Sequence, residues 1–251
     1  MTTTTAKPIA LILGSGPRIG GAVAARYKQL GYEVAVVSRR GPATPTKSAE
    51  EEGGYLQIGA DLADTSAYAG IYGALKTAFP DGDGVPDVVF FNAASLTPPA
   101  EEGNMFSTPL EGFKHDLDLS VTGAFVAARE AYKLWEASRE AGSTKKRQFI
   151  FTGNCLSSYF VPSATFVTLG IHKNATTYWV GLADKLYKDK GFRFLVADQR
   201  EADGGPAYNP SAEAHAELVD RIAKDPEAWP FYITFHDGTK YVDFEKGRTW
   251  N

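Results

Sequence analysis

Short apolar runs alternate along the chain with longer segments in which apolar residues recur at helical spacing. The runs predict buried strands at residues 10–13, 33–38, 55–60, 87–91, 148–152, 192–197 and 231–235. The segments between them predict helices at residues 19–30, 65–79, 110–137, 165–189 and 211–224. This alternation predicts an α/β fold of three layers, with a doubly wound, mainly parallel sheet and helical crossovers on both faces.

The length of the chain suits one domain. Its 251 residues, 43% hydrophobic and 22% charged, are enough to bury one substantial core, so we expect a single domain over residues 1–251. Within it, the region from about 200 to 251 is expected to form a substrate lid and a C-terminal part. Residues 42–54, rich in Pro, Thr and Glu, predict a surface loop, and residues 81–84 predict the turn that ends the second helix.

Composition excludes several classes of function. A net charge of -4 gives no sign of a nucleic-acid partner, because nucleic-acid-binding domains usually carry a basic excess. The single cysteine, Cys155, permits no intrachain disulfide and fits a reducing compartment. Residues 1–8 lack the apolar core of a signal peptide, and no apolar run approaches the roughly 18 residues that span a bilayer. We therefore expect a cytoplasmic protein with no membrane partner.

A glycine-rich turn follows the first predicted strand and opens the first predicted helix. Gly14 allows a sharp turn off the strand, Gly16 leaves room for a pyrophosphate against the backbone, and Gly20 lets the helix pack close to the sheet. The start of the helix then offers free N–H groups and a partial positive charge to phosphate. This turn, in this place, predicts a dinucleotide site.

The end of the second predicted strand indicates which dinucleotide binds. An acidic residue there would hold the ribose 2′-hydroxyl of NAD, whereas arginine suits a 2′-phosphate. Ser38 occupies the acidic position and Arg39 follows it, so the sequence favours NADP(H). Arg18 in the glycine turn is a possible second phosphate contact. Arg40 is left open between a phosphate contact and a solvated charge.

Several ordered motifs make the chain, over about residues 7–244, similar to the short-chain dehydrogenases/reductases, which share a Rossmann fold. Residues 14–20 resemble the family's glycine turn, Asp61 its adenine-binding aspartate and residues 92–94 its Asn-Asn-Ala-Gly segment. Residues 121–125 resemble the helix behind its active site, and residues 172–175 the end of its Tyr-x-x-x-Lys motif. The residues expected to bind NADP(H) are Gly14, Ser15, Gly16, Arg18, Ile19, Gly20, Ser38, Arg39, Asp61, Leu62, Asn92, Ala93, Ala94 and Lys173.

The expected catalytic residues depart from the family pattern. In that family a tyrosine protonates the substrate oxygen, a lysine lowers the tyrosine pKa and binds the nicotinamide ribose, and a serine holds the carbonyl. The lysine corresponds to Lys173, but the tyrosine position falls on Leu169 and that of a helical asparagine on Ser120. The serine falls near Asn154, or on Ser157 if the loop register is shifted. Residues 198–200 replace the expected Pro-Gly pair.

Loss of the tyrosine leaves the proton donor open. General acid catalysis is typically worth ~10²–10⁴ in rate. His172 is one candidate, although it is rotated about 100° from Lys173 and is expected to be a partly exposed helix residue. Tyr159 could reach a substrate from the loop above the site, whereas Tyr178 is expected to lie in the core. An iminium substrate, or one protonated by water, would need no tyrosine.

The remaining candidates are weaker. Asp116 and Asp118 are expected to be surface or interface charges, and Phe166 and Trp179 core residues or subunit contacts. His115, His215 and His236 lack metal-site spacing, so no metal is expected. The aromatic C-terminal part suits an apolar pocket or a subunit contact, with residues Tyr208, Trp229, Phe231 and Tyr232. The resemblance implies a homodimer or homotetramer formed through the two long helices.

We therefore expect an NADPH-dependent oxidoreductase that reduces a small organic carbonyl, imine or activated alkene without the usual tyrosine. The alternative is a protein that keeps the cofactor pocket but is redox-inactive. It would act as a binding or regulatory module, or catalyse a non-redox step such as cyclisation or isomerisation. Leu169 is the residue that separates the two hypotheses.

Overall fold

The computed structural model describes residues 6–80 and 83–244. They form an eight-stranded sheet in the order β3-β4-β2-β1-β5-β6-β7-β8. Neighbouring strands are parallel except for β3, which pairs antiparallel with β4. The strands are β1 (Ile9–Leu13), β2 (Glu33–Ser38), β3 (Thr46–Lys47), β4 (Leu56–Gly59), β5 (Val88–Phe91), β6 (Arg147–Thr152), β7 (Phe192–Gln199) and β8 (Tyr232–Phe235).

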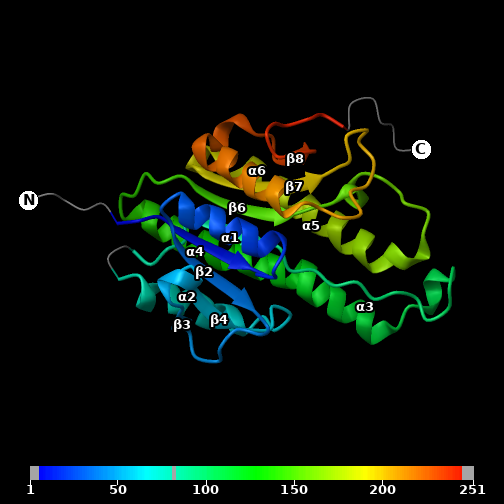
Figure 1. Cartoon of the computed structure of the whole chain (residues 1–251), viewed down its shortest axis with the longest axis horizontal. Helices are drawn as coiled ribbons and strands as arrows, with labels where there is room; N and C mark the ends of the chain where they lie inside the picture. Colours follow the sequence, from blue (N-terminus) through cyan, green and yellow to red (C-terminus); the bar gives the residue numbers. More distant parts are fainter. Residues whose placement is uncertain (1–5, 81–82, 245–251) are drawn as a thin grey trace, which may run out of the picture.

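Helices cover both faces of the sheet, and the predicted three-layer, doubly wound fold is confirmed (Figure 1). One face packs against α1 (Ile19–Gln29) and α6 (Ala212–Lys224). The other packs against α2 (Ala67–Ala78), α4 (Ala124–Glu140) and α5 (Val167–Tyr187), and α3 (Leu110–Leu117) precedes α4. The core consists of two apolar layers, one on each side of strands that are themselves apolar.

Two local features differ from the sequence prediction. The predicted loop at 42–54 contains the short strand β3 and a 3₁₀ turn at Glu50–Glu52. The long helix predicted at 110–137 continues to Glu140 and contains a π-helical segment, Asp118–Gly123, between α3 and α4. Residues 81 and 82 of the predicted turn, and residues 1–5 of the N-terminal segment, lie outside the described residues.

The strand order places the site. The chain runs from β1 outward to β2 and β4 on one side, and then from β5 to β8 on the other. The order reverses between β1 and β5, and in such sheets ligands bind at the carboxyl ends of the strands beside the reversal. The glycine turn follows β1 and residues 92–94 follow β5, so both segments lie at this point.

Candidate active site

The glycine turn has the geometry that the sequence predicts. Gly14 has φ 90°, and a Cβ there would lie 2.5 Å from the Ala93 nitrogen, so only glycine fits without strain. At Gly20 a Cβ would lie 2.6 Å from the Gly14 carbonyl oxygen, which shows how closely α1 approaches the turn. At Gly16 a Cβ would meet no atom within 4 Å. The fold itself therefore requires glycine at positions 14 and 20, whereas the space beside Gly16 is open.

The ribose end of the expected site lies at the ends of β2 and β4. Ser38 is the last residue of β2 and is half-buried, while Arg39 and Arg40 are exposed immediately after it. Asp61 is also exposed, and its carboxylate accepts a hydrogen bond from the Ala63 amide at 3.0 Å. Leu62, by contrast, is buried in the core. Two arginines thus stand at the position where a 2′-phosphate would be recognised.

Arg18 has a partner that the sequence did not suggest. Its Nη2 donates to the Asn209 side-chain oxygen at 2.5 Å and to the Pro210 carbonyl at 3.0 Å. Both acceptors belong to the β7–α6 loop, residues 200–211, which covers the expected lid region. Arg18 therefore connects the glycine turn to this loop.

Asn92 links three elements at the reversal of the strand order. Its Nδ2 donates to the Gly14 carbonyl at 3.0 Å, and its Oδ1 accepts from the Thr152 hydroxyl at 3.1 Å. Its backbone amide also donates to the Leu13 carbonyl at 2.8 Å. The side chain therefore fixes the ends of β1, β5 and β6 relative to one another, next to Ala93 and Ala94.

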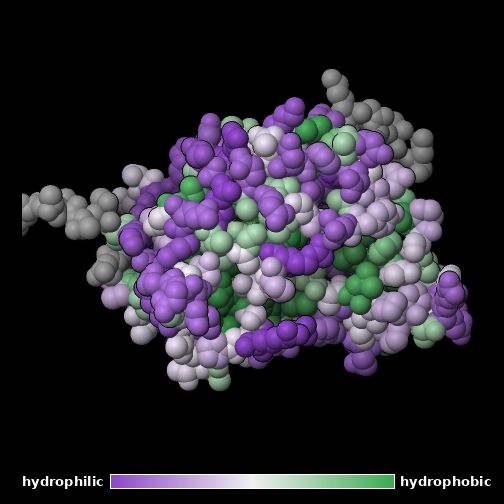
Figure 2. Space-filling view, in the orientation of Figure 1, coloured by the Kyte–Doolittle hydropathy of each residue, from purple (hydrophilic) through white to green (hydrophobic). Residues whose placement is uncertain are grey.

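A cavity of about 290 Å³ lies beside these strand ends. Its lining is mostly apolar, and Lys173 is its one charged residue among the described residues. The lining residues are Asn92, Ala94, Thr152, Gly153, Asn154, Cys155, Leu156, Val161, Phe166, Leu169, Lys173, Pro206, Ala207, Tyr208 and Pro210. Figure 2 shows apolar side chains at the surface around α3. The exposed apolar residues of the neighbouring helices include Leu110 of α3 and Ile171 of α5. The cavity suits a small, uncharged, largely apolar molecule.

Lys173 is buried at the cavity wall. Its Nζ donates to the Thr152 carbonyl and lies 4.5 Å from the centre of the Phe151 ring. Burial lowers the pKa of Lys173 from 10.5 to about 7, because the ammonium loses its hydration, and the Asp198 carboxylate offsets part of this effect. The lysine is therefore held in a fixed orientation and titrates near neutral pH.

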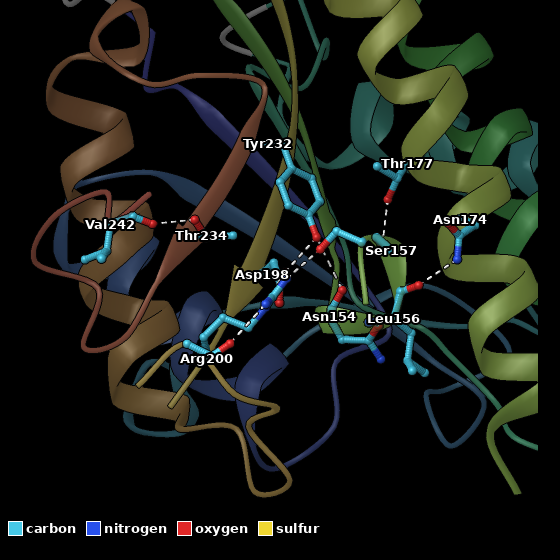
Figure 3. Close-up of polar contacts among 12 residues, drawn as sticks. Asn154, Leu156, Ser157, Asn174, Thr177, Asp198, Arg200, Tyr232, Thr234 and Val242 are labelled. Carbon is cyan, nitrogen blue, oxygen red and sulfur yellow. Dashed lines mark hydrogen bonds and ion pairs between the residues drawn. The ribbon is translucent and has the colours of Figure 1, made fainter. Parts of the chain in front are cut away.

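The other expected catalytic residues are not all brought together. Asn154 lines the cavity, and its side-chain oxygen accepts from the Leu156 amide at 3.1 Å. Ser157 is buried and turned toward α5, where its hydroxyl accepts from Thr177 at 3.0 Å (Figure 3). Ser120 is buried in the π-helical segment with no hydrogen-bond partner for its hydroxyl. Tyr159 is partly exposed and is not among the lining residues.

Leu169 and Lys173 line the same cavity. They lie one helical turn apart on α5, so their side chains share a face of the helix. A leucine has no proton to exchange. The cavity wall is therefore apolar at the position one turn before the lysine.

Three expectations about single residues are wrong. His172 is fully buried rather than partly exposed, and its Nε2 lies 3.2 Å from the Ser95 carbonyl. Burial and the Lys173 charge lower the pKa of His172 to about 3, so it is neutral near pH 7 and is not a proton donor there. Asp116 is buried rather than at the surface, and it accepts from the Ser95 hydroxyl and the Thr97 amide, both at 2.6 Å. Tyr178 is exposed rather than in the core.

A buried polar network connects two strands to the loops around the cavity, and sequence reasoning missed it. Arg200 Nε donates to an Asp198 carboxylate oxygen at 2.7 Å, and the Tyr232 hydroxyl donates to the same oxygen at 2.7 Å (Figure 3). Arg200 also donates to the Ser158 hydroxyl at 2.8 Å and to the Gly204 carbonyl at 3.2 Å. The network therefore joins β7 and β8 to the two loops that line the cavity. Alternating charge at 198 and 200 was its only sequence signal.

Burial and pairing act in opposite directions on this network. Burial disfavours the charged guanidinium, but the hydrogen bond and charge of Asp198 outweigh it, so the pKa of Arg200 is raised. Burial and the Asp198 charge also raise the pKa of Tyr232, which stays a neutral donor. The Arg200 guanidinium therefore keeps its charge despite its burial.

Metal sites and membrane-spanning helices are both absent from the described residues. Within residues 6–80 and 83–244, no group of three or more His, Cys, Asp or Glu side chains is placed to hold a metal ion. No helix in the same part of the chain is both long and apolar enough to cross a membrane.

Comparison with known proteins identifies the family. Residues 16–147 match the family model described as enoyl-(acyl carrier protein) reductase. The chain is also 32% identical over 249 residues to the short chain dehydrogenase/reductase dmxR12 of Cryptosporiopsis sp. (strain 8999), covering 94% of this chain and 95% of that protein. The chain belongs to the short-chain dehydrogenase/reductase family.

Solved structures of the family share the fold at low sequence identity. A metagenomic short-chain oxidoreductase in complex with NADP has a TM-score of 0.72 and 14% identity, covering 92% of this chain and 97% of that chain. A Brucella ovis oxidoreductase of the short-chain dehydrogenase/reductase family, with a partially ordered NAD, has a TM-score of 0.69 and 17% identity, covering 92% of this chain and 100% of that chain. At this identity the likeness concerns the fold alone.

The residues present fit a dinucleotide. The open space at Gly16 lies at the start of α1, where backbone N–H groups can receive a pyrophosphate. Arg39 and Arg40 stand at the end of β2 without a nearby acidic residue in the sequence from 34 to 49, where NAD recognition would need one. Lys173 and Asn92 lie farther along the same edge of the sheet. The residues along this edge of the sheet therefore fit a dinucleotide.

Proposed function

We propose that this protein is an NADPH-dependent oxidoreductase that reduces a small, uncharged organic carbonyl, imine or activated alkene. The observation that carries the proposal is that Lys173 and Asn154 line one mostly apolar cavity, at the strand ends beside the glycine turn. The description of the matched family model, an enoyl-(acyl carrier protein) reductase, supports including activated alkenes.

Each residue has a stated role in this proposal. Arg39 binds the 2′-phosphate, the backbone at Gly16 approaches the pyrophosphate, and Lys173 contacts the nicotinamide ribose. The Asn154 amide, whose oxygen is already used by Leu156, has its N–H groups available to polarise a substrate oxygen. The bound cofactor supplies the hydride. The apolar lining excludes water from the reacting atoms and favours substrates without charge.

A second candidate function rests on Leu169. We infer that this position, one turn before Lys173, is where the family's proton-donating tyrosine is replaced by leucine. A protein with this change could retain the cofactor pocket without redox activity and serve as a binding or regulatory module. It could also use the pocket for cyclisation or isomerisation. In either case the dinucleotide would bind but hydride would not be transferred.

Calorimetric titration with NADPH and with NADH tests the proposal first. We expect NADPH to bind more tightly than NADH, and Arg39→Ala to weaken NADPH binding by about 1.5–3 kcal/mol, the usual worth of a charged hydrogen bond, without changing NADH binding. Arg221→Ala is the matched control, because it removes an equal charge from an exposed arginine on α6 that pairs with Glu217. Binding of neither nucleotide would contradict the cofactor assignment.

Hydride transfer to a panel of ketones, imines and enones then separates the two candidate functions. NADPH consumption with any member supports the reductase. Tight NADPH binding with no consumption across the panel would favour the redox-inactive alternative. The same assay with charged analogues of an active ketone tests the preference for uncharged substrates, which follows from a lining whose one charged side chain is bonded to Thr152.

We also propose that the protein forms a homodimer or homotetramer through α4 and α5. Phe125, Leu182 and Leu186 are large apolar residues exposed on these helices. They line a shallow, mostly apolar groove of about 210 Å³. Light scattering should give a mass above one chain, and Leu186→Glu should lower it. The cytoplasmic location expected from composition stays a prediction.

A further inference from the structure

The cavity contains few groups able to give up a proton. Leu169 provides none, and the described lining offers three side chains with an acidic proton, namely Cys155, Lys173 and Tyr208. Cys155 is buried, and its apolar surroundings disfavour the thiolate that proton transfer would leave. A reduction that ends in an alcohol still needs one proton per hydride. Among the side chains of the described lining, the candidates for the donor are therefore Lys173 and Tyr208.

Lys173 is poorly placed to act as the donor in each turnover. Its Nζ is bonded to the Thr152 carbonyl and stands over the Phe151 ring, and the residue is only 5% exposed. An ammonium group buried in this way has little access to the water that would restore its proton. Tyr208 also lines the cavity but is 73% exposed, so its hydroxyl can recover a proton directly from water.

The loop that carries Tyr208 is anchored on both sides of this residue. On the C-terminal side, Arg18 donates to Asn209 at 2.5 Å and to Pro210 at 3.0 Å. The Ser211 amide donates to the Gln199 side chain at 2.7 Å. On the N-terminal side, Arg200 donates to the Gly204 carbonyl and bridges Pro206 through its backbone. Tyr208 is therefore presented to the cavity between two fixed points.

We propose that Tyr208 is the proton donor of the reduction, acting from the β7–α6 loop in place of a donor on α5. The proposal rests on the reductase function proposed above. In the step, a hydride from the reduced nicotinamide forms a C–H bond at the carbonyl carbon, and the π pair of the C=O bond moves to oxygen. The O–H bond of Tyr208 breaks as its proton joins that oxygen. The product is an alcohol, the nicotinamide is oxidised, and water reprotonates the phenolate.

The decisive variant is Tyr208→Phe, which removes only the hydroxyl. The ketone probe is tetralone, chosen because it is small, uncharged and largely apolar, like the molecules that the cavity suits. We expect kcat for tetralone to fall by about 10²–10⁴, the usual worth of a general acid, with the NADPH dissociation constant unchanged. Tyr178→Phe is the matched control, because Tyr178 is equally exposed, at 77%, but lies on α5 away from the cavity lining.

A substrate that needs no proton separates proton donation from substrate binding. The N-methyl dihydroisoquinolinium ion has the ring system of tetralone and becomes a neutral amine on hydride transfer alone. Its positive charge should weaken binding to the mostly apolar cavity in both proteins, so kcat at saturating substrate is compared between Tyr208→Phe and the unchanged protein. Tyr208→Phe should reduce it within about threefold of the unchanged protein, against the ~10²–10⁴ loss on the ketone. Equal losses on both substrates would mean that Tyr208 binds rather than protonates, and would overturn the proposal. Unchanged ketone reduction in Tyr208→Phe would overturn it too.

These outcomes differ from failure of the proposed function. One outcome is that the unchanged protein binds NADPH and still transfers no hydride to tetralone, to the iminium ion or to any member of the carbonyl panel. In that case the reductase function itself fails, and with it the role of Tyr208. If the unchanged protein is active, the comparison of Tyr208→Phe with Tyr178→Phe judges Tyr208 alone.

Discussion

Replacing Arg200 with methionine tests whether the buried network of Asp198, Arg200 and Tyr232 stabilises the fold. The side chains of Arg200 and Asp198 are both 0% exposed and meet at 2.6 Å. Arg200→Met keeps most of the aliphatic volume but leaves the Asp198 carboxylate buried without its countercharge. Removing one partner of a buried ion pair typically costs about 3–5 kcal/mol. Because the Tyr232 hydroxyl still donates to Asp198 at 2.7 Å, we expect the lower end, about 3 kcal/mol.

The assay is urea unfolding of Arg200→Met beside the unchanged protein, with thermal unfolding as a second measure. For a domain of this size, about 3 kcal/mol corresponds to a Tm decrease of roughly 6–12 °C. Arg221→Met is the matched control, because Arg221 pairs with Glu217 at the surface of α6, where its side chain is 47% exposed. Exposed pairs of this kind contribute about 0–1 kcal/mol.

The double variant identifies the cause. If the cost of Arg200→Met comes from the uncompensated charge, then adding Asp198→Asn should recover part of the lost stability, since an amide is far less costly to bury alone than a carboxylate. A loss below about 1 kcal/mol in Arg200→Met, or a double variant at least as unstable as the sum of the two single changes, would refute this reasoning.

Two further predictions follow from the turn and from α5. Gly14→Ala should lower Tm, because Gly14 has φ 90° and its Cβ would lie 2.5 Å from the Ala93 nitrogen, whereas Gly16→Ala should leave Tm unchanged and weaken NADPH binding at least about tenfold. Thermal unfolding and calorimetric titration of both variants check this, and weakened binding with lowered Tm in Gly16→Ala would contradict it. Burial and the Lys173 charge lower the pKa of His172 from 6.5 to about 3. Between pH 6.5 and about pH 3, His172 therefore binds a proton in the unfolded chain but not in the folded protein. The free energy of unfolding should therefore fall as pH drops below 6.5, by at most about 1.4 kcal/mol per pH unit from this residue. Urea unfolding at several pH values should show a smaller pH slope for His172→Phe than for the unchanged protein. An unchanged slope would show that His172 does not cause it.

The sequence predicted the order of the main elements because apolar periodicity is a local signal. It placed the glycine turn, the strand ends and Lys173 correctly relative to the sheet, since each follows directly from an element of clear pattern. It missed β3, whose two residues are exposed and carry no alternation. It also placed Asp116 at the surface, because a carboxylate buried by Ser95 and Thr97 looks like any other charge on a helix.

Contacts between distant segments could not be predicted from the sequence. The Arg18 and Asn209 side chains meet across 191 positions of sequence, and nothing local to either residue indicates the other. The same holds for Tyr232 and Asp198, which come from neighbouring strands. Tyr208 was noted only as one of several aromatic residues, because the route of the β7–α6 loop back over the cavity depends on these contacts.

The π-helical segment at Asp118–Gly123 has a consequence for the long helix as a whole. Buried residues recur every four positions at Asp116, Ser120, Ala124 and Ala128, whereas an ordinary α-helix would turn such a row by about 40° at each step. A π-helical turn contains more residues than an α-helical turn, so the segment reduces this rotation between Asp116 and Ala124. The two ends of the helix can then brace the same strand: Asp116 binds residues 95 and 97 just after β5, and the Trp135 indole donates to the Pro86 carbonyl just before it at 2.7 Å. The long helix is thus hydrogen-bonded to the chain both before and after β5. Asn92, which lies between these two anchored segments, is held in place from both directions.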